Sequence, residues 1–275
     1  MEDTPAIRFR AQTLRDLESL APAWNLERFG SETADMNATI STKTLNGCSL
    51  HPIVVPSRRR LLDLYCCAGG AGEGYKLAGF DVTGVDNKPQ PKNPHRFVLA
   101  DALEYLAEHG HEYDAIHASP PCQAYTKAGK QWRKEGREYP DMIAATRDAL
   151  ENTGKPWVLE NVPGAPLRNP VLLNGSVFGI LVHRPRLFET NWPLPQPIVP
   201  PMKPVKMGRP IRKGDIVQPV GHFSGVAYAA REMGLPWMGQ GELAQAIPPA
   251  YTKWIAEQLL RVAAWHNNCP TVTST

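Results

Sequence analysis

A cysteine stands directly after two prolines in the segment Ser119-Pro120-Pro121-Cys122-Gln123. Each proline ring fixes the backbone φ, so this turn would hold the cysteine thiol at a set angle. The turn follows residues 113–118, which we expect to form a strand, and open α/β sheets carry out their chemistry beyond the carboxyl ends of their strands. A cysteine taken singly is more often a small buried apolar residue. At this position we interpret Cys122 as a nucleophile that acts through its thiolate.

One carboxyl group and two guanidinium groups follow in positions that could serve such a nucleophile. Glu160 ends the expected strand 157–160, so its carboxyl should project into the same crevice and could protonate or hydrogen-bond a ring nitrogen. The alternative is that Glu160 only caps a turn. Arg184 and Arg186 alternate along the chain and share one face if that segment is extended. Their forked donors suit carbonyl or phosphate oxygens.

A glycine-rich loop, residues 69–74, connects an expected strand, residues 61–65, to an expected helix. Such loops let the backbone approach a ligand and present the free N–H groups of the helix to it. Asp86 ends the next strand, where a carboxylate can accept from ribose hydroxyls, and Asp101 could bond an adenine amino group. The bland alternative is a tight turn with a structural aspartate. NAD and S-adenosylmethionine (AdoMet) both suit such a loop, but it does not match GxGxxG and it begins with Asp63-Leu64-Tyr65, which favours AdoMet.

Strands and helices alternate along the chain in the way that positions these residues. Strands are expected at 61–65, 80–86, 113–118 and 157–160, and helices at 75–78, 102–109, 141–150 and after Pro248-Pro249. This order predicts βαβ units and an α/β, mostly parallel, Rossmann-like sheet. Nine of the 27 prolines fall between residues 185 and 219, which argues against a continuous helix or a central strand there. We therefore expect a small irregular second lobe.

Composition narrows the class of protein. The 275 residues are 42% hydrophobic and 21% charged, which fits one large α/β domain with a smaller lobe. No apolar run is long enough to cross a bilayer, and the first residues do not resemble a secretory signal, so we expect no membrane partner. The five cysteines form no CxxC pair and no disulfide framework, which favours a reducing compartment and no metal. A net charge of +3 permits a polyanionic partner without requiring one.

Taken together and in this order, the motifs resemble those of the DNA (cytosine-5) methyltransferase family. The resemblance spans residues 61 to about 262. Its motifs are Asp63-Leu64-Tyr65 through Gly74, Ala78-Gly79-Phe80, Pro120-Pro121-Cys122-Gln123, Glu160-Asn161-Val162 and Arg184-Pro185-Arg186, with weaker matches at Arg231-Glu232 and Ile247-Pro248-Pro249. It implies an AdoMet-dependent enzyme of DNA methylation that flips a cytosine out of the duplex.

The resemblance also implies roles for individual residues. Cys122 would attack C6 of the cytosine, Glu160 would engage its N3 edge, and Arg186 would contact its O2 with Arg184 in support. The residues implied to line the AdoMet site are Tyr65, Gly69, Gly70, Asp86, Asp101 and Pro121. Three positions depart from the family: Cys67 and Ser119 stand where glycine is usual, and Val182 stands where glutamine is usual.

The expected domains follow from the same reading. Residues 59–190 and 245–265 would form the catalytic AdoMet-binding domain and 191–244 a small target-recognition lobe. Residues 1–58 would be an extension, partly disordered or docked as an arm, and 266–275 a flexible tail. Basic residues in the loop after Cys122 and in the lobe are expected to bind DNA: Lys127, Lys130, Lys203, Lys206, Arg209 and Arg212.

The expected partner is double-stranded DNA, met in the cytoplasm of a prokaryotic cell or a viral host cell. A monomer is expected, and in a restriction–modification pair a cognate restriction endonuclease would accompany it. Two other interpretations remain open at this stage. One is an RNA cytosine-5 methyltransferase, since a small lobe could suit a structured RNA, and the other is a catalytically silent AdoMet-fold protein that binds nucleic acid as a regulator.

Overall fold

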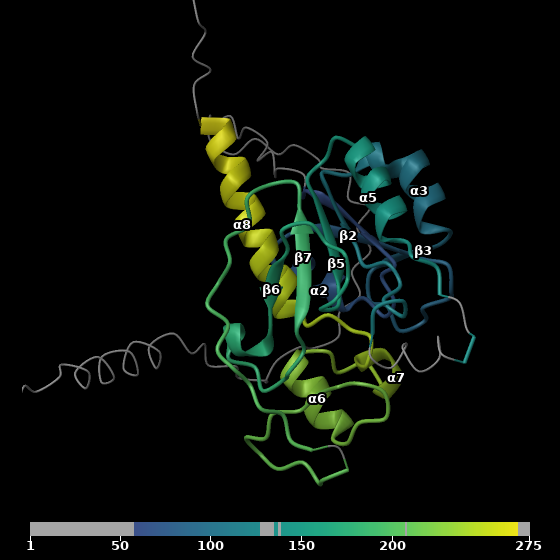
Figure 1. Cartoon of the computed structure of the whole chain (residues 1–275). Coiled ribbons are helices and arrows are strands. Elements are labelled where there is room, and N and C mark those ends of the chain that lie inside the picture. Colours follow the sequence, from purple (N-terminus) through teal and green to yellow (C-terminus); the bar gives the residue numbers. More distant parts are fainter. Residues whose placement is uncertain (1–57, 127–134, 137–138, 207, 269–275) are drawn as a thin grey trace, which may run out of the picture. The chain divides into compact units, whose positions relative to one another are not determined.

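The computed structural model describes residues 58–126, 135–136, 139–206 and 208–268, all within one unit of the chain (Figure 1). Three of the sequence predictions fall outside these residues. They are the N-terminal extension up to residue 57, the proposed DNA contacts Lys127 and Lys130, and the last seven residues of the tail.

A seven-stranded sheet forms the centre of the described chain. Its strands are β1 Arg60–Leu64, β2 Asp81–Asp86, β3 Arg96–Leu99, β4 Ala115–Ala118, β5 Trp157–Asn161, β6 Val171–Leu173 and β7 Arg186–Thr190. Their order is β3-β2-β1-β4-β5-β7-β6. The first five strands are parallel, and β7 runs antiparallel to both of its neighbours. The predicted fold class, an α/β Rossmann-like and mostly parallel sheet, is confirmed.

Helices lie on both faces of this sheet and in the small lobe. They are α2 Gly70–Leu77, α3 Ala102–His109, α5 Ile143–Asn152, α6 Val226–Met233, α7 Gln240–Leu243 and α8 Pro249–Asn268, with 3-10 turns η1 Gly110–Glu112 and η2 Gly175–Phe178. The pair α2 and α8 lies against one face, and α3 with α5 against the other (Figure 1). Successive side chains of β1 serve the two faces in turn, as strand geometry requires: Leu61 joins the apolar cluster with α2 and α8, and Leu62 the cluster with α3 and α5. None of the described helices is long and apolar enough to cross a membrane.

Close packing of α2 on α8 explains one glycine of the loop. A Cβ at Gly74 would collide with Thr252 and the carbonyl of Pro249 at the start of α8. Thr252 in turn donates a hydrogen bond to the Ala71 carbonyl, with an oxygen–oxygen distance of 2.8 Å. The last helix therefore fixes the helix that begins at the glycine loop.

The proline-rich segment corrects one prediction. A central strand was not expected between residues 185 and 219, yet β7 lies in the sheet between β5 and β6. The reason is local, because Pro185 and Pro193 flank this strand and none of its five residues is a proline. After β7, Trp192 and Leu194 still pack against the sheet, so the chain leaves it later than the lobe boundary predicted at residue 191.

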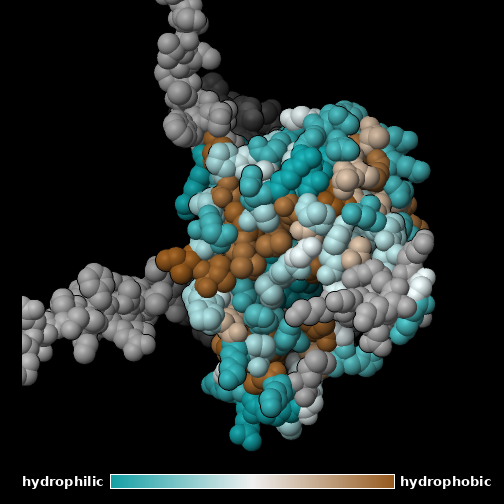
Figure 2. Space-filling model, in the orientation of Figure 1, coloured by the Kyte–Doolittle hydropathy of each residue, from teal (hydrophilic) through white to brown (hydrophobic). Residues whose placement is uncertain are grey.

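The small lobe has an apolar cluster of its own, to which both α6 and α7 contribute. The buried members that come from the lobe are Val217, Phe223, Ala229, Ala230, Met233, Leu235, Met238 and Leu243, and the cluster is completed by Ala68, Val182 and Ala246 from outside residues 191–244. Trp237 connects the lobe to the glycine loop by donating its Nε1–H to the Ala68 carbonyl at 3.0 Å. Apolar side chains gather on the face where α8, β6 and β7 lie, whereas the outer tip of the lobe is hydrophilic (Figures 1 and 2). The final helix continues to Asn268, so the first three residues of the predicted flexible tail are helical.

Candidate active site

A cavity of about 360 Å³ opens at the carboxyl ends of β1, β2, β4 and β5, with α7 of the small lobe along one wall. Eight of the predicted site residues line it: Tyr65, Gly70, Asp86, Asp101, Pro121, Cys122, Glu160 and Arg186. Gly69 and Arg184 are adjacent to it but are not lining residues. The structure therefore brings together residues as far apart in the sequence as Tyr65 and Arg186.

The Pro-Pro turn is held from both sides. The backbone N–H of Ser119 donates to the Leu64 carbonyl at 3.2 Å, which ties the turn to β1. The side chain of Asn161, next to Glu160 on β5, donates to the Pro120 carbonyl at 3.0 Å. The carbonyl of Cys122 then accepts from the N–H of Tyr125 at 2.9 Å, so a tight turn begins at the cysteine. These bonds fix the backbone that carries the thiol.

The Cys122 thiol is half-buried, between groups of opposite charge. Burial raises the pKa of this thiol, and the carboxylate of Glu160 raises it further. The guanidinium groups of Arg186 and Arg184 lower it. The Cys122 thiol therefore loses its proton more readily when the negative charge of Glu160 is neutralised.

Glu160 and Arg186 form a buried ion pair with unused hydrogen-bonding capacity. Arg186 Nε lies 2.9 Å from Glu160 Oε1. The N–H is not aligned with that oxygen, and Oε1 is buried without a hydrogen-bond partner among the described residues. Burial raises the pKa of the Glu160 carboxyl, and the two arginines oppose the rise. A buried acceptor without a partner costs free energy, so this carboxyl is prepared for a donor that enters the cavity.

Arg184 does not line the cavity but binds the backbone of residues that do. It is buried and donates Nε–H to the Ala246 carbonyl at 2.9 Å and one Nη1–H to the Pro219 carbonyl at 2.6 Å. A third bond, from Nη2, reaches the Ala244 carbonyl at 2.7 Å. The two arginines therefore differ in their partners, because Arg186 pairs with Glu160 and Arg184 binds backbone carbonyls. Arg184 holds in place the segment before α8 that lines the cavity.

The glycine loop and Asp86 build the other half of the cavity. Asp86 Oδ2 accepts from the N–H of Cys67 at 3.1 Å, and Oδ1 accepts from the N–H of Lys88 at 2.9 Å. Cys67 has a φ of 45°, in the left-handed region that favours glycine, so the bond from Asp86 supports a strained residue of the loop. Asp101 caps α3, because its Oδ1 accepts from the N–H groups of Leu103 and Glu104.

Asp63 lines the same cavity but was not selected from the sequence as a site residue. Its side chain is buried, and neither carboxyl oxygen has a hydrogen-bond partner in the part of the chain that the structure describes. Burial raises the pKa of this carboxyl to about 8, and the nearby amide of Gly72 offsets only part of the rise. A cationic ligand in the cavity would stabilise the ionised form. The available signal was a single carboxylate within the apolar strand β1.

Ser119 and residues of the lobe also line the cavity without having been selected. They are Met238, Glu242 and Ala244 of the lobe, followed by Gln245 and Ala246 just beyond it. The Glu242 carboxylate is fixed by an ion pair with Lys92, 2.8 Å from Nζ to Oε1. Because these contacts join distant segments, the sequence offered no signal for them.

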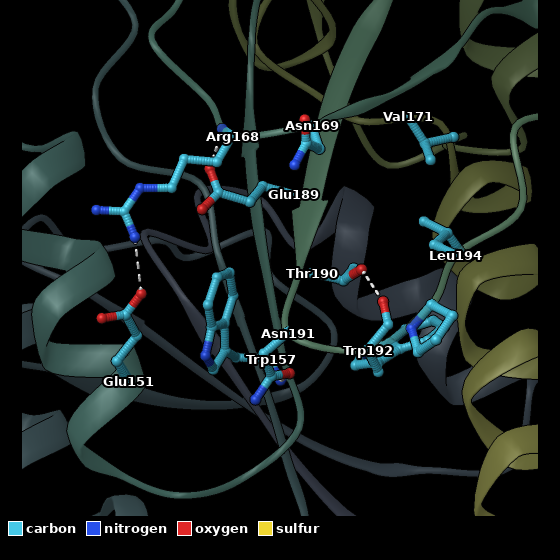
Figure 3. A pocket seen from close by; sticks show the side chains of 11 residues that line it. Glu151, Trp157, Arg168, Asn169, Val171, Glu189, Thr190, Asn191, Trp192 and Leu194 are labelled. Carbon is cyan, nitrogen blue, oxygen red and sulfur yellow. Dashed lines mark hydrogen bonds and ion pairs between the residues drawn. The ribbon is translucent and has the colours of Figure 1, made fainter.

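A second cavity, of about 480 Å³, lies at the opposite end of β5 and β7 (Figure 3). It contains none of the predicted site residues. Its buried carboxylate, Glu189, already accepts bonds from Arg147 Nε at 2.6 Å, Arg147 Nη2 at 2.8 Å and the N–H of Arg168 at 2.7 Å. Of these two cavities, the first therefore holds the predicted site residues and the buried carboxyl oxygens that lack partners among the described residues.

Known proteins resemble this chain in part of its sequence and in its fold. No family model matches the sequence. A 125-residue stretch is 28% identical to the type II methyltransferase M.AquIA of Picosynechococcus sp., covering 38% of this chain and 49% of that protein. The chain thus spans about half the length of this curated relative.

Solved structures extend the similarity to most of the chain. A putative DNA modification methyltransferase encoded within an E. coli prophage is 13% identical, with a TM-score of 0.55 over 75% of this chain and 99% of that one. The methyltransferase EhMeth of Entamoeba histolytica is 12% identical, with a TM-score of 0.51 over 75% of this chain and 99% of that one. The chain has the Rossmann-like fold of AdoMet-dependent methyltransferases.

Proposed function

We propose that this chain is an AdoMet-dependent DNA (cytosine-5) methyltransferase. The observation that carries the proposal is the convergence of Cys122, Glu160 and Arg186 in one cavity whose other half is built by Asp63 and Asp86. A thiol, a carboxyl with a raised pKa and a forked cation are the three groups needed to attack a pyrimidine ring and to hold its polar edge. The partial sequence similarity to a type II methyltransferase supports the same proposal.

The residues of the cavity fit AdoMet. Asp86 presents two carboxylate oxygens, already oriented by backbone amides, to ribose hydroxyls. The buried carboxyl of Asp63, which has no hydrogen-bond partner in the described structure, suits the positive charge of the methionine part. When bound, AdoMet would supply the methyl group as an electrophile.

The protein's own residues would perform the remaining steps on a cytosine flipped into the cavity. The Cys122 thiolate forms a bond to C6, and the C5–C6 double bond provides the electron pair that makes C5 nucleophilic. Glu160 shares a proton with N3 and Arg186 donates to O2, which together offset the negative charge that builds on the ring. After C5 has gained its methyl group it loses its proton, the S–C6 bond breaks, and the thiolate returns to Cys122.

The small lobe would hold the DNA. Its basic residues Lys203, Lys206 and Arg212 are exposed, as phosphate or base contacts require. Arg209 is engaged differently, because its Nη2 lies 2.6 Å from Oδ1 of Asp215 in an ion pair. This favours Arg212 over Arg209 as a reader of a guanine edge. Lys127 and Lys130, outside the described residues, are proposed to contact DNA beside the flipped base.

A trapping experiment tests the proposal. A pool of DNA duplexes with 5-fluorocytosine in random sequence contexts should form an adduct with the protein that survives denaturation, because fluorine cannot leave C5 as a proton does. The adduct should require AdoMet and should be absent in Cys122→Ala. An undiminished yield in Cys122→Ala would assign the nucleophile to another residue.

The same experiment with RNA separates the alternatives. An adduct with RNA and none with duplex DNA would indicate an RNA cytosine methyltransferase. AdoMet binding without an adduct on either nucleic acid would indicate a catalytically silent protein.

A further inference from the structure

A buried row of hydrogen bonds runs beneath the active-site cavity and ends at its wall. The Tyr75 hydroxyl on α2 lies 3.0 Å from Nδ1 of His117 on β4. The other ring nitrogen, Nε2, lies 2.9 Å from Oγ of Ser119, which lines the cavity. Tyr75 and His117 are both 0% exposed. A polar row in the core that serves only packing would be costly, so its direction and end point are informative.

The direction of the row follows from its buried end. Burial raises the pKa of the Tyr75 phenol well above its ordinary value, so the phenol keeps its proton. His117 Nδ1 is its hydrogen-bond partner among the described residues, and the phenol therefore donates to that nitrogen. Burial also lowers the pKa of His117 to about 3, so the imidazole is neutral and carries one N–H. With Nδ1 accepting, that N–H is on Nε2 and donates to the Ser119 oxygen.

The row continues to the carboxyl proposed to engage the substrate. Since the Ser119 oxygen accepts from His117, the serine proton can point elsewhere, and Ser119 lines the same cavity as Glu160. The serine hydroxyl lowers the pKa of the Glu160 carboxyl, which favours its ionised form. Four other charged or titratable groups act on or respond to this carboxyl. They are Arg186 and Arg184, whose charges stabilise its ionised form, and Cys122 and Asp63, whose ionisation it opposes.

We propose that His117 and Ser119 are positioning residues, which hold the serine hydroxyl as a fixed hydrogen-bond donor to the Glu160 carboxylate and so control when Glu160 takes up a proton. The inference deepens the proposed function and rests on it for the role of Glu160. The row favours the ionised carboxylate, because the opposite direction would leave the buried phenol proton of Tyr75 without an acceptor. Glu160 would then gain its proton only when a ring nitrogen is present to share it.

The direct test needs neither AdoMet nor nucleic acid. In protein with ¹⁵N-labelled histidine, the ring signals of His117 should show the neutral tautomer with its proton on Nε2 between pH 5 and 8. A proton on Nδ1 would reverse the row and overturn the proposal. This measurement uses the unchanged protein, so it does not depend on the folding of any variant.

A second measurement follows the carboxyl itself. With ¹³C-labelled glutamate, the Glu160 signal is the one lost in Glu160→Gln, and its titration gives the acid dissociation constant. Ser119→Ala should decrease this constant about tenfold or more, since a hydrogen bond to a charged group contributes about 1.5–3 kcal/mol. Ser119→Thr, which keeps the hydroxyl, should restore the constant. Tyr75→Phe should have a smaller effect in the same direction. It removes the donor that keeps Nδ1 of His117 as an acceptor, but it leaves the Ser119 hydroxyl in place.

Two control variants remove comparable groups elsewhere. Ser176→Ala removes a buried hydroxyl on η2 that has no hydrogen-bond partner among the described residues. Tyr105→Phe removes a phenol whose oxygen lies 3.2 Å from that of Tyr113. Both should leave the Glu160 titration unchanged. An unaltered titration in Ser119→Ala would also overturn the proposal. If these tests succeed while no adduct forms on nucleic acid, the hydrogen-bonded row is supported and the proposed function fails. If an adduct forms while these tests fail, only the inference about the row is overturned.

Discussion

The strands β5 and β7 carry two buried glutamate–arginine pairs that differ in how completely they are hydrogen-bonded. In the ladder Glu160 lies opposite Phe188 and Glu189 lies opposite Leu159, so neighbouring rungs place the two carboxyls on opposite faces of the sheet. Glu189 accepts two bonds from Arg147 and one from the N–H of Arg168. Glu160 Oε1 lies at a similar distance from Arg186 Nε but lacks a hydrogen bond.

This difference separates a pair that holds the fold from a pair that is prepared for a ligand. A buried ion pair contributes to stability only when good geometry and additional bonds repay the loss of hydration. The pair of Glu189 and Arg147 meets that condition, and it joins α5 to β7. The pair of Glu160 and Arg186 does not meet it, and its unused capacity faces the cavity. A substitution in one pair should therefore affect a different property of the protein from a substitution in the other pair.

The largest expected effect is on the rate of reaction in Glu160→Gln. Glutamine keeps the size of the side chain and loses the proton exchange, so the rate of methylation should fall by about 10²–10⁴-fold. The free energy of unfolding should change by about 1 kcal/mol or less, because the lost charge was incompletely paired. Single-turnover methylation and urea denaturation on the same preparations measure both quantities. Loss of stability in step with activity would show that Glu160 is structural.

The opposite pattern is expected for Arg147→Met. Its removal leaves the buried Glu189 carboxylate without its cation, so the free energy of unfolding should fall by about 3–5 kcal/mol. The rate per folded molecule should remain near that of the native protein, because the first cavity is untouched. Arg168→Met is the matched control: its ion pair with Glu151 is exposed, so the change should be about 1 kcal/mol or less. Equal losses in the two variants would remove the distinction between the pairs.

Many of the strands and site residues in this comparison can be predicted from the sequence. The others cannot, for physical reasons. The buried strands β1, β2, β4 and β5 are indicated by short segments rich in apolar residues, and each places a site residue at or just beyond its carboxyl end. The strand β6 has only three residues, β3 is partly buried with exposed ends, and β7 lies among prolines. These strands depend on their neighbours in the sheet for stability.

The same limit applies to side chains. The convergence of Cys122 and Glu160 follows from strand order, which the sequence predicts. The hydrogen-bond partners of Arg184 cannot be predicted in this way, since its acceptors are carbonyls 35 to 62 residues further along the chain. The absence of partners around Asp63 among the described residues is likewise a property of the packed sheet.

A smaller effect is expected from pH, through Asp63. The pKa of its carboxyl is raised from 3.8 to about 8 in the folded chain, so between these values the folded state holds a proton that the unfolded state has released. Stability must then fall as pH rises through this window, by at most about 1.4 kcal/mol per pH unit from this one group. Unfolding free energies at pH 5, 6 and 7 should show a flatter dependence in Asp63→Asn than in the native protein. Parallel curves would mean that Asp63 is ionised in the fold and already paired.

The smallest effect concerns which end of the sheet meets DNA. The first cavity adjoins the small lobe, whose Lys203 and Lys206 are exposed, whereas Lys155 and Arg168 lie near the second cavity. Each phosphate neutralised by a cation contributes about 0.9 to the slope of log K against log salt. Replacing Lys203 and Lys206 together by alanine should therefore flatten the slope by roughly 2, which changes log K by only about 0.6 for a twofold change in salt. Fluorescence anisotropy on a labelled duplex between 50 and 200 mM salt resolves such a change. Lys155→Ala combined with Arg168→Ala removes the same charge at the other end and should leave the slope unaltered. If this control pair flattens the slope and the lobe pair does not, the duplex binds at the second cavity, and the nucleophile of the first cavity would need another substrate.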